Sequence, residues 1–189
     1  MTSIILIGPR CTGKTAIGRE LSEILNIPLI DGDEEFIKQY GPIDEFIKKN
    51  KGDWKSFRYH ESKIIEYVCK NNSNIIFTPG GGAVAHDQGE IYRKHNQITL
   101  QNFGKVIYIL PDENLEKSAI ILTERFLNDP KSKNNRPSLS KESNHYKEML
   151  DIIKKRHQLY LDACHELIYI QNQTVEETAK QITHSSHIL

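Results

Sequence analysis

The chain has 189 residues, in which 25 Lys and Arg residues balance 25 Asp and Glu residues. This length suits one domain with a full hydrophobic core rather than two, and the zero net charge excludes a general attraction to nucleic acid or to an anionic membrane. No apolar segment approaches the roughly 20 residues that a membrane-spanning helix needs. From the length, we expect one domain over residues 1–189.

Strand and helix patterns alternate along the chain. Short apolar, β-branched runs predict buried strands at 3–8, 27–30, 74–78, 105–110 and 166–170. Amphipathic patterns predict helices at 17–25, 33–50 with a break at Gly41-Pro42, 54–71, 87–95, 112–127, 142–162 and 175–182. This alternation predicts a parallel sheet covered by helices on both faces. Ligands of such sheets bind outside the carboxyl ends of the strands, so the residues after each strand are site candidates.

The first predicted strand runs into the sequence GPRCTGKT at residues 8–15, which fits the phosphate-binding pattern G-x-x-x-x-G-K-[ST]. Gly8 and Gly13 allow the backbone to turn its N–H groups inward around an anion. Lys14 is spaced to reach the β- and γ-phosphates, and the Thr15 hydroxyl is a candidate ligand for Mg2+. The alternative is a plain glycine turn with a solvated Lys14. The order of strand, glycine loop and helix favours nucleotide binding instead.

Two carboxylates, Asp31 and Asp33, follow the second predicted strand. One interpretation is that one of them caps the helix that begins near Glu34. The other is a division of labour, in which one supports the Mg2+ shell and the other accepts a hydrogen bond from a substrate hydroxyl. The third strand leads into Gly80-Gly81-Gly82. This triplet is either a flexible turn or a place where the backbone approaches a ligand closely.

Two arginines interrupt the apolar faces of predicted helices. Arg58 lies on one face of the helix 54–71, with Glu61 one turn later, and Arg156 lies on the apolar stripe of the helix 142–162. A buried cation is costly unless an anion meets it. The structural interpretation is two internal salt bridges, with Glu61 as the partner of Arg58. The functional interpretation is a pocket in which both guanidinium groups hold the carboxylate of a substrate.

The most polar stretch of the chain is 128–145, which is too rich in Lys, Asn, Ser and Pro to belong to the core. Arg125 precedes this stretch, and Arg136 lies near its middle. Each is compatible with an ordinary surface loop. In a protein that has to shield a phosphoryl group from water, Arg136 also fits a lid that carries a charge-stabilising arginine.

The three cysteines, Cys11, Cys69 and Cys164, are far apart and form no C-x-x-C pair. An odd, scattered set without a recognisable signal peptide favours reduced thiols in a cytosol. We expect a cytoplasmic monomer whose partners are small molecules, with no nucleic acid and no membrane among them.

Taken together and in this order, GPRCTGKT, DGD (31–33), FR (57–58), PGGG (79–82), RP (136–137) and KKRHQLY (154–160) make the chain resemble the shikimate kinase family of P-loop kinases. The resemblance covers nearly the whole chain. It implies a three-layer α/β/α P-loop sandwich, with a five-stranded parallel sheet in the order 2-3-1-4-5, an acceptor-binding helical region at about 33–62 and a mobile lid at about 125–142. It also implies transfer of a phosphoryl group from ATP to the 3-hydroxyl of shikimate, with Mg2+ as cofactor.

The resemblance also implies a role for each matching residue. Catalytic roles fall on Lys14, Asp33 and Arg136. ATP binding falls on Gly8, Cys11, Thr12, Gly13, Lys14, Thr15, Ala16, Arg125 and Arg136. Shikimate binding falls on Asp33, Arg58, Gly80, Gly81, Gly82 and Arg156. Metal binding falls on Thr15 and Asp31.

Two residues of the phosphate loop depart from the family pattern. Cys11 stands where the family usually has Gly or Ala, so its side chain has to point away from the phosphates. Arg10 stands where an apolar residue is usual, near the acceptor pocket. Two alternatives therefore stay open. One is a related kinase that acts on a different hydroxy acid, and the other is a nucleotide-binding homologue without catalytic activity.

Overall fold

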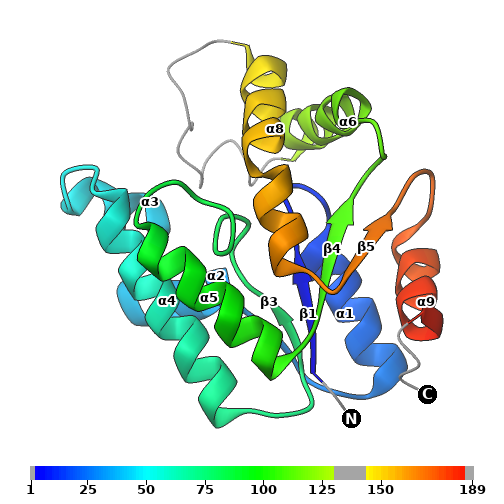
Figure 1. Cartoon of the computed structure of the whole chain (residues 1–189), viewed down its shortest axis with the longest axis horizontal. Helices are drawn as coiled ribbons and strands as arrows, with labels where there is room; N and C mark the ends of the chain where they lie inside the picture. The colour runs from blue at the N-terminus through cyan, green and yellow to red at the C-terminus, as the bar shows by residue number, and fades with distance from the viewer. Residues whose placement is uncertain (1–2, 130–143, 186–189) are drawn as a thin grey trace.

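A computed structural model describes residues 3–129 and 144–185 (Figure 1). Their elements, in chain order, are β1 (Ser3–Ile7), α1 (Lys14–Leu25), β2 (Leu29–Asp31), α2 (Gly32–Tyr40), α3 (Ile43–Lys49), α4 (Trp54–Asn71), β3 (Ile76–Thr78), α5 (Glu90–Phe103), β4 (Gly104–Leu110), α6 (Leu115–Asn128), α8 (His145–Ala163), β5 (Glu166–Tyr169) and α9 (Val175–Ser185). Within these ranges, no helix combines the length and the apolar character that crossing a membrane requires.

The strands form one parallel sheet in the order β2-β3-β1-β4-β5. Helices α1 and α9 cover one face, and α4, α5 and α8 cover the other (Figure 1). The predicted sandwich and its strand order are confirmed. Since all strands run in the same direction, the residues that follow β1, β2 and β3 meet at one edge of the sheet.

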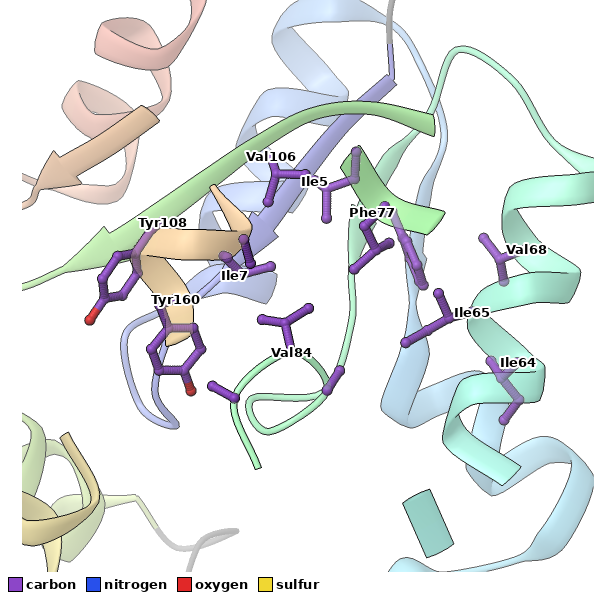
Figure 2. Close-up of a cluster of buried hydrophobic side chains, with 14 of the residues drawn as sticks. Ile5, Ile7, Ile64, Ile65, Val68, Phe77, Val84, Val106, Tyr108 and Tyr160 are labelled. Atoms are coloured by element: carbon purple, nitrogen blue, oxygen red, sulfur yellow. The ribbon is translucent and has the colours of Figure 1, made fainter. Parts of the chain in front are cut away.

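The sheet separates two hydrophobic cores because successive side chains of a strand point to opposite faces. In β1, Ile4 and Leu6 belong to the core under α1 and α9, whereas Ile5 and Ile7 belong to the core under α4, α5 and α8. Figure 2 shows the second core, into which Val84 points from the loop after β3. An apolar side chain therefore anchors the loop that carries the glycine triplet in the core.

One predicted helix is shorter than the helix in the structure. The helix predicted at 87–95 stops before a run of polar residues, whereas α5 runs from Glu90 to Phe103. The polar residues are used inside the protein: Asn96 donates to the Ala83 carbonyl at 2.8 Å and Gln97 donates to the Val84 carbonyl at 3.0 Å. These bonds fasten the loop after the glycine triplet to α5, so polarity here marks an attachment rather than the end of a helix.

The predicted acceptor region, 33–62, consists of α2, α3 and the first half of α4. The predicted break at Gly41-Pro42 separates α2 from α3, as expected. Of the predicted lid, residues 125–128 form the last turn of α6, and residues 130–143, including Arg136, lie outside the described residues.

Two isoleucines on neighbouring helices test the assignment of the core. Ile65 on α4 is 1% exposed, and Ile91 on α5 is 71% exposed. We expect Ile65→Ala to lower the free energy of unfolding by about 2 to 5 kcal/mol, because it leaves a cavity in a packed core. The same change at Ile91 should stay within about 0.5 kcal/mol of the wild type. Urea denaturation measures both values, and equal losses would show that the core is wrongly placed.

Candidate active site

The phosphate loop joins β1 to α1 and closes around the side chain of Lys14. The Lys14 ammonium donates to the carbonyls of Gly8 at 3.0 Å and Pro9 at 2.8 Å, and the buried Thr12 hydroxyl also donates to the Pro9 carbonyl at 2.9 Å. Gly13 caps α1 in the left-handed conformation. The first turn of α1 has no acidic residue, so the helix presents N–H groups and a positive dipole end, which suit a phosphate.

Asp31 caps the helix that follows it, as one interpretation of the sequence held, and it also bonds to Thr15 of the phosphate loop. Its Oδ1 accepts from the backbone N–H groups of Asp33 at 3.0 Å and Glu34 at 3.2 Å, which caps α2. Its Oδ2 accepts from the hydroxyls of Thr15 at 2.7 Å and Thr78 at 3.1 Å. The cap fixes the carboxylate, and the fixed carboxylate orients the Thr15 hydroxyl at the mouth of the phosphate loop. Thr78, the last residue of β3, was missed by the sequence analysis, although its place at the carboxyl end of a strand is a usable signal.

The oxygen atoms of Thr15 and Asp31 suit Mg2+, which prefers a few protein oxygens and shares its coordination with phosphates and water. Among the described residues, no group of three or more His, Cys, Asp or Glu side chains forms a metal cage of its own. The donors present therefore fit an ion that arrives with a nucleotide rather than one held by the protein alone.

Two adjoining cavities lie at this edge of the sheet. The smaller, of about 180 Å³, is bordered by the phosphate loop. The larger, of about 580 Å³, is bordered by α2, α4, α8 and the glycine triplet. Of the residues that the structure describes, six border both cavities: Arg10, Thr15, Asp31, Asp33, Gly81 and Asp129. A molecule in the larger cavity and a phosphate in the smaller one would therefore face each other beside Asp33.

The glycine triplet lies so close to charged side chains that a Cβ atom at Gly80 or Gly82 would displace them. A Cβ atom on Gly80 would lie 2.6 Å from Glu61 Oε1 and 2.7 Å from Asp33 Oδ1, and one on Gly82 would lie 2.5 Å from Arg58 Nη2. The triplet thus brings the backbone close to other parts of the protein, and its approach to a ligand stays a prediction. The groups that it approaches in the structure are the charged residues of the larger cavity.

Arg58 and Glu61 form an ion pair inside the protein. Arg58 Nη1 donates to both carboxylate oxygens of Glu61, at 3.0 and 2.8 Å, and the two side chains are only 5% and 8% exposed. Burial raises the pKa of Glu61, and the neighbouring Arg58 opposes that shift. The salt bridge therefore exists, but it does not exclude the functional interpretation, because both residues also border the larger cavity.

Arg156 borders the same cavity from α8. One turn later on that helix, the Tyr160 hydroxyl donates to the carbonyl of Gly81, and its ring stacks on Tyr108 of β4 with the ring centroids 4.8 Å apart (Figure 2). The two arginines therefore reach one cavity from helices that are far apart in the sequence, as the functional interpretation requires.

The remaining predicted residues of the phosphate site gather around the loop. Cys11 has a φ of 65°, in the left-handed region, and its side chain packs against the apolar cluster between α6 and α8. Cys11 also borders the smaller cavity, so the expectation that its sulfur points away from the phosphates stays a prediction. Arg125 donates to the Cys11 carbonyl at 3.5 Å, which places it at the outer edge of the loop, and Ala16 lies in the first turn of α1 beside the smaller cavity.

His86, for which the sequence carries no signal, follows the glycine triplet and is fully buried. Neither ring nitrogen makes a hydrogen bond of normal geometry among the described residues. Burial, together with the positive charges of Arg58, Arg156 and Arg93, lowers the pKa of His86 to about 3. The imidazole is therefore neutral at physiological pH and adds no positive charge behind the arginines.

The depressed pKa of His86 makes stability depend on pH. Below about pH 6.5 the unfolded chain binds a proton at this residue that the folded chain does not bind. Stability should therefore fall as the pH falls, by about 2 kcal/mol between pH 7 and pH 5. We expect His86→Gln to remove that part of the slope, as measured by urea denaturation at both pH values. The same substitution at the exposed His184 is the control, and an equal effect there would refute the assignment.

The chain resembles known proteins along nearly its full length. A family profile described as "Shikimate kinase" matches residues 10–186. "Shikimate kinase 2" of Yersinia enterocolitica is 32% identical and aligns over 96% of this chain and 94% of its own length. "Shikimate kinase" of Leptospira borgpetersenii is 33% identical over 95% of this chain and 94% of its own.

Solved structures agree. The shikimate kinase of Aquifex aeolicus has a TM-score of 0.70 at 26% identity, with 98% of this chain and 96% of that one covered. The shikimate kinase of Acinetobacter baumannii, solved in complex with shikimate, has a TM-score of 0.83 at 24% identity, with 100% of this chain and 94% of that one covered, and supports the fold. This chain belongs to the shikimate kinase family.

Proposed function

We propose that this protein transfers the γ-phosphoryl group of ATP to the 3-hydroxyl of shikimate, giving shikimate 3-phosphate and ADP. The observation that carries the proposal is the meeting of two cavities beside Asp33, in a chain that belongs to the shikimate kinase family. One cavity has the geometry of a phosphate site, and the other has two arginines in its wall. Such a pair suits a substrate that carries both a carboxylate and a hydroxyl group.

The phosphate loop binds the nucleotide. The backbone of Gly8 to Gly13 and the start of α1 surround the phosphates, and Lys14 exchanges its bonds to the loop carbonyls for bonds to phosphate oxygens. Thr15 would hold Mg2+, with Asp31 behind it. When bound, Mg2+ neutralises charge that develops between the β- and γ-phosphates.

Asp33 orients the attacking hydroxyl. Its carboxylate lies against Gly80 and borders both cavities. A hydroxyl that donates to Asp33 is held towards the phosphate site, which supplies the positioning on which phosphoryl transfer mainly depends. Because the transition state is loose, the carboxylate has little need to remove the proton before the new bond forms.

Arg58 and Arg156 hold the carboxylate of shikimate from two sides. Glu61 keeps Arg58 in place through Nη1, while Arg156 enters the cavity from α8. We assign Arg125 to the adenine side of the nucleotide, since it lies at the outer edge of the loop. Arg136, which lies outside the described residues, is proposed on its motif alone to contact the transferring phosphate.

Turnover tests the function directly. We expect release of ADP from ATP and Mg2+ to require shikimate and to be faster with shikimate than with quinate or gluconate. Lys14→Ala should abolish turnover, because the phosphates lose their main cation. A hydroxy acid that supports faster turnover than shikimate would replace the proposed acceptor. Tight nucleotide binding without turnover on any acceptor would instead identify a non-catalytic homologue.

Removing one arginine of the acceptor site tests the mode of binding. Arg156→Ala should weaken shikimate binding by about 2 to 5 kcal/mol, the range for loss of one partner of a buried charge pair. Arg156→Lys should not restore it, because lysine lacks the planar fork that matches a carboxylate. Trp54 is the single tryptophan of the chain and borders the larger cavity, so its fluorescence can report the titration.

The control for this titration is Arg19→Ala on α1, whose side chain is 66% exposed. It should bind shikimate like the wild type, and both variants should retain the affinity for ATP measured without shikimate. If Arg156→Ala binds shikimate as tightly as Arg19→Ala does, the carboxylate site is wrongly assigned.

A further inference from the structure

Arg156 lies on α8 between two attachments of that helix to the site. One turn after Arg156, Tyr160 bonds to the glycine triplet. Two turns before it, Glu148 meets Arg10 of the phosphate loop, with Arg10 Nη2 donating to Glu148 Oε1 at 3.4 Å. The span from Glu148 to Tyr160 is helical throughout, and a helix of this length is stiff. The position of Arg156 is therefore set by what holds the two ends.

The attachment at Glu148 is buried. The side chains of Arg10 and Glu148 are 14% and 4% exposed, and the guanidinium of Arg10 lies 4.6 Å from the ring centroid of Phe126 on α6. Separating a carboxylate from a guanidinium at a buried site costs free energy, because little water is there to replace the lost bond. The pair therefore resists separation, and with it the first turn of α8 stays against the phosphate loop.

Arg10 connects this attachment to both halves of the site. It borders both cavities, and a Cβ atom on Gly81 would lie 3.3 Å from the Arg10 backbone nitrogen. The residue that holds the first turn of α8 is thus part of the loop that surrounds the phosphates, and it lies against the same glycine triplet that holds Tyr160.

We infer that the Arg10–Glu148 ion pair is a positioning pair for acceptor binding, which holds α8 so that Arg156 faces Arg58 across the cavity. This inference rests on the acceptor role proposed above for Arg156. It assigns to Arg10 a role through α8 rather than through contact with the substrate.

Two variants that remove opposite charges separate this role from a plain electrostatic one. Arg10→Met removes a positive charge near an anion site, and Glu148→Gln removes a negative charge. If the charges acted on shikimate through space, the first variant would weaken its binding and the second would strengthen it. If the pair positions α8, both variants should weaken it, by about 2- to 30-fold, the range for residues that act without touching the ligand.

The double variant should bind shikimate as tightly as the single variant with the lower affinity, because both changes break the same interaction. Arg10→Lys, which keeps the charge, should bind shikimate more tightly than Arg10→Met does and guards against misfolding of the apolar variant. Fluorescence titration of Trp54 with shikimate gives each Kd, and thermal unfolding gives each Tm. The titrations are run well below the lowest Tm.

Three results would overturn the inference: opposite changes in affinity for the two single variants, a lower Tm with an unchanged Kd, or additive losses in the double variant. Arg156→Ala in the same titration separates this failure from failure of the proposed function. If Arg156→Ala weakens binding and the pair variants do not, only the positioning role is lost. If Arg156→Ala binds like the wild type, the acceptor site itself is wrong.

Discussion

The site depends on the close packing of the Gly80-Gly81-Gly82 backbone against four other parts of the chain. Gly80 lies against Asp33 and Glu61, Gly82 against Arg58, and Gly81 against the phosphate loop, while the Gly81 carbonyl accepts from Tyr160. A side chain at Gly80 or Gly82 would push these groups apart. The triplet thus brings α2, α4, α8 and the phosphate loop to one point, and Val84 anchors its loop in the hydrophobic core (Figure 2).

The charges around this point leave a net positive charge in the wall of the larger cavity, which suits one bound anion. Glu61 neutralises Arg58 and fixes its orientation, and His86 stays uncharged behind both arginines. Arg156 then adds a positive charge to the larger cavity, and the carboxylate of Asp33 lies at the border with the phosphate site. A substrate with a carboxylate at one end and a hydroxyl at the other matches this order, and the reversed orientation would put its carboxylate beside Asp33.

The sequence predicted the parallel sheet and the residues of the phosphate loop, because glycine spacing and apolar runs are local signals. The strand order followed only from the resemblance to the shikimate kinase family. It also identified Arg58 and Arg156, because a charge on an apolar helix face is visible without a structure. It could not decide between a salt bridge and a substrate site for Arg58, since one guanidinium serves in both. The Arg10–Glu148 pair could not be predicted, because its two residues lie far apart in the sequence. The burial of His86 could not be predicted either, because it results from tertiary packing that no local pattern signals.

The central claim is that the larger cavity recognises a carboxylate through two arginines. The most direct test compares the affinity of the protein for shikimate with its affinity for shikimate methyl ester, by calorimetric titration. The ester keeps the ring and the hydroxyls but carries no negative charge. Our account predicts that the ester binds at least about 30-fold more weakly, because it loses charge-assisted hydrogen bonds worth about 2 kcal/mol or more. Equal affinities would contradict it.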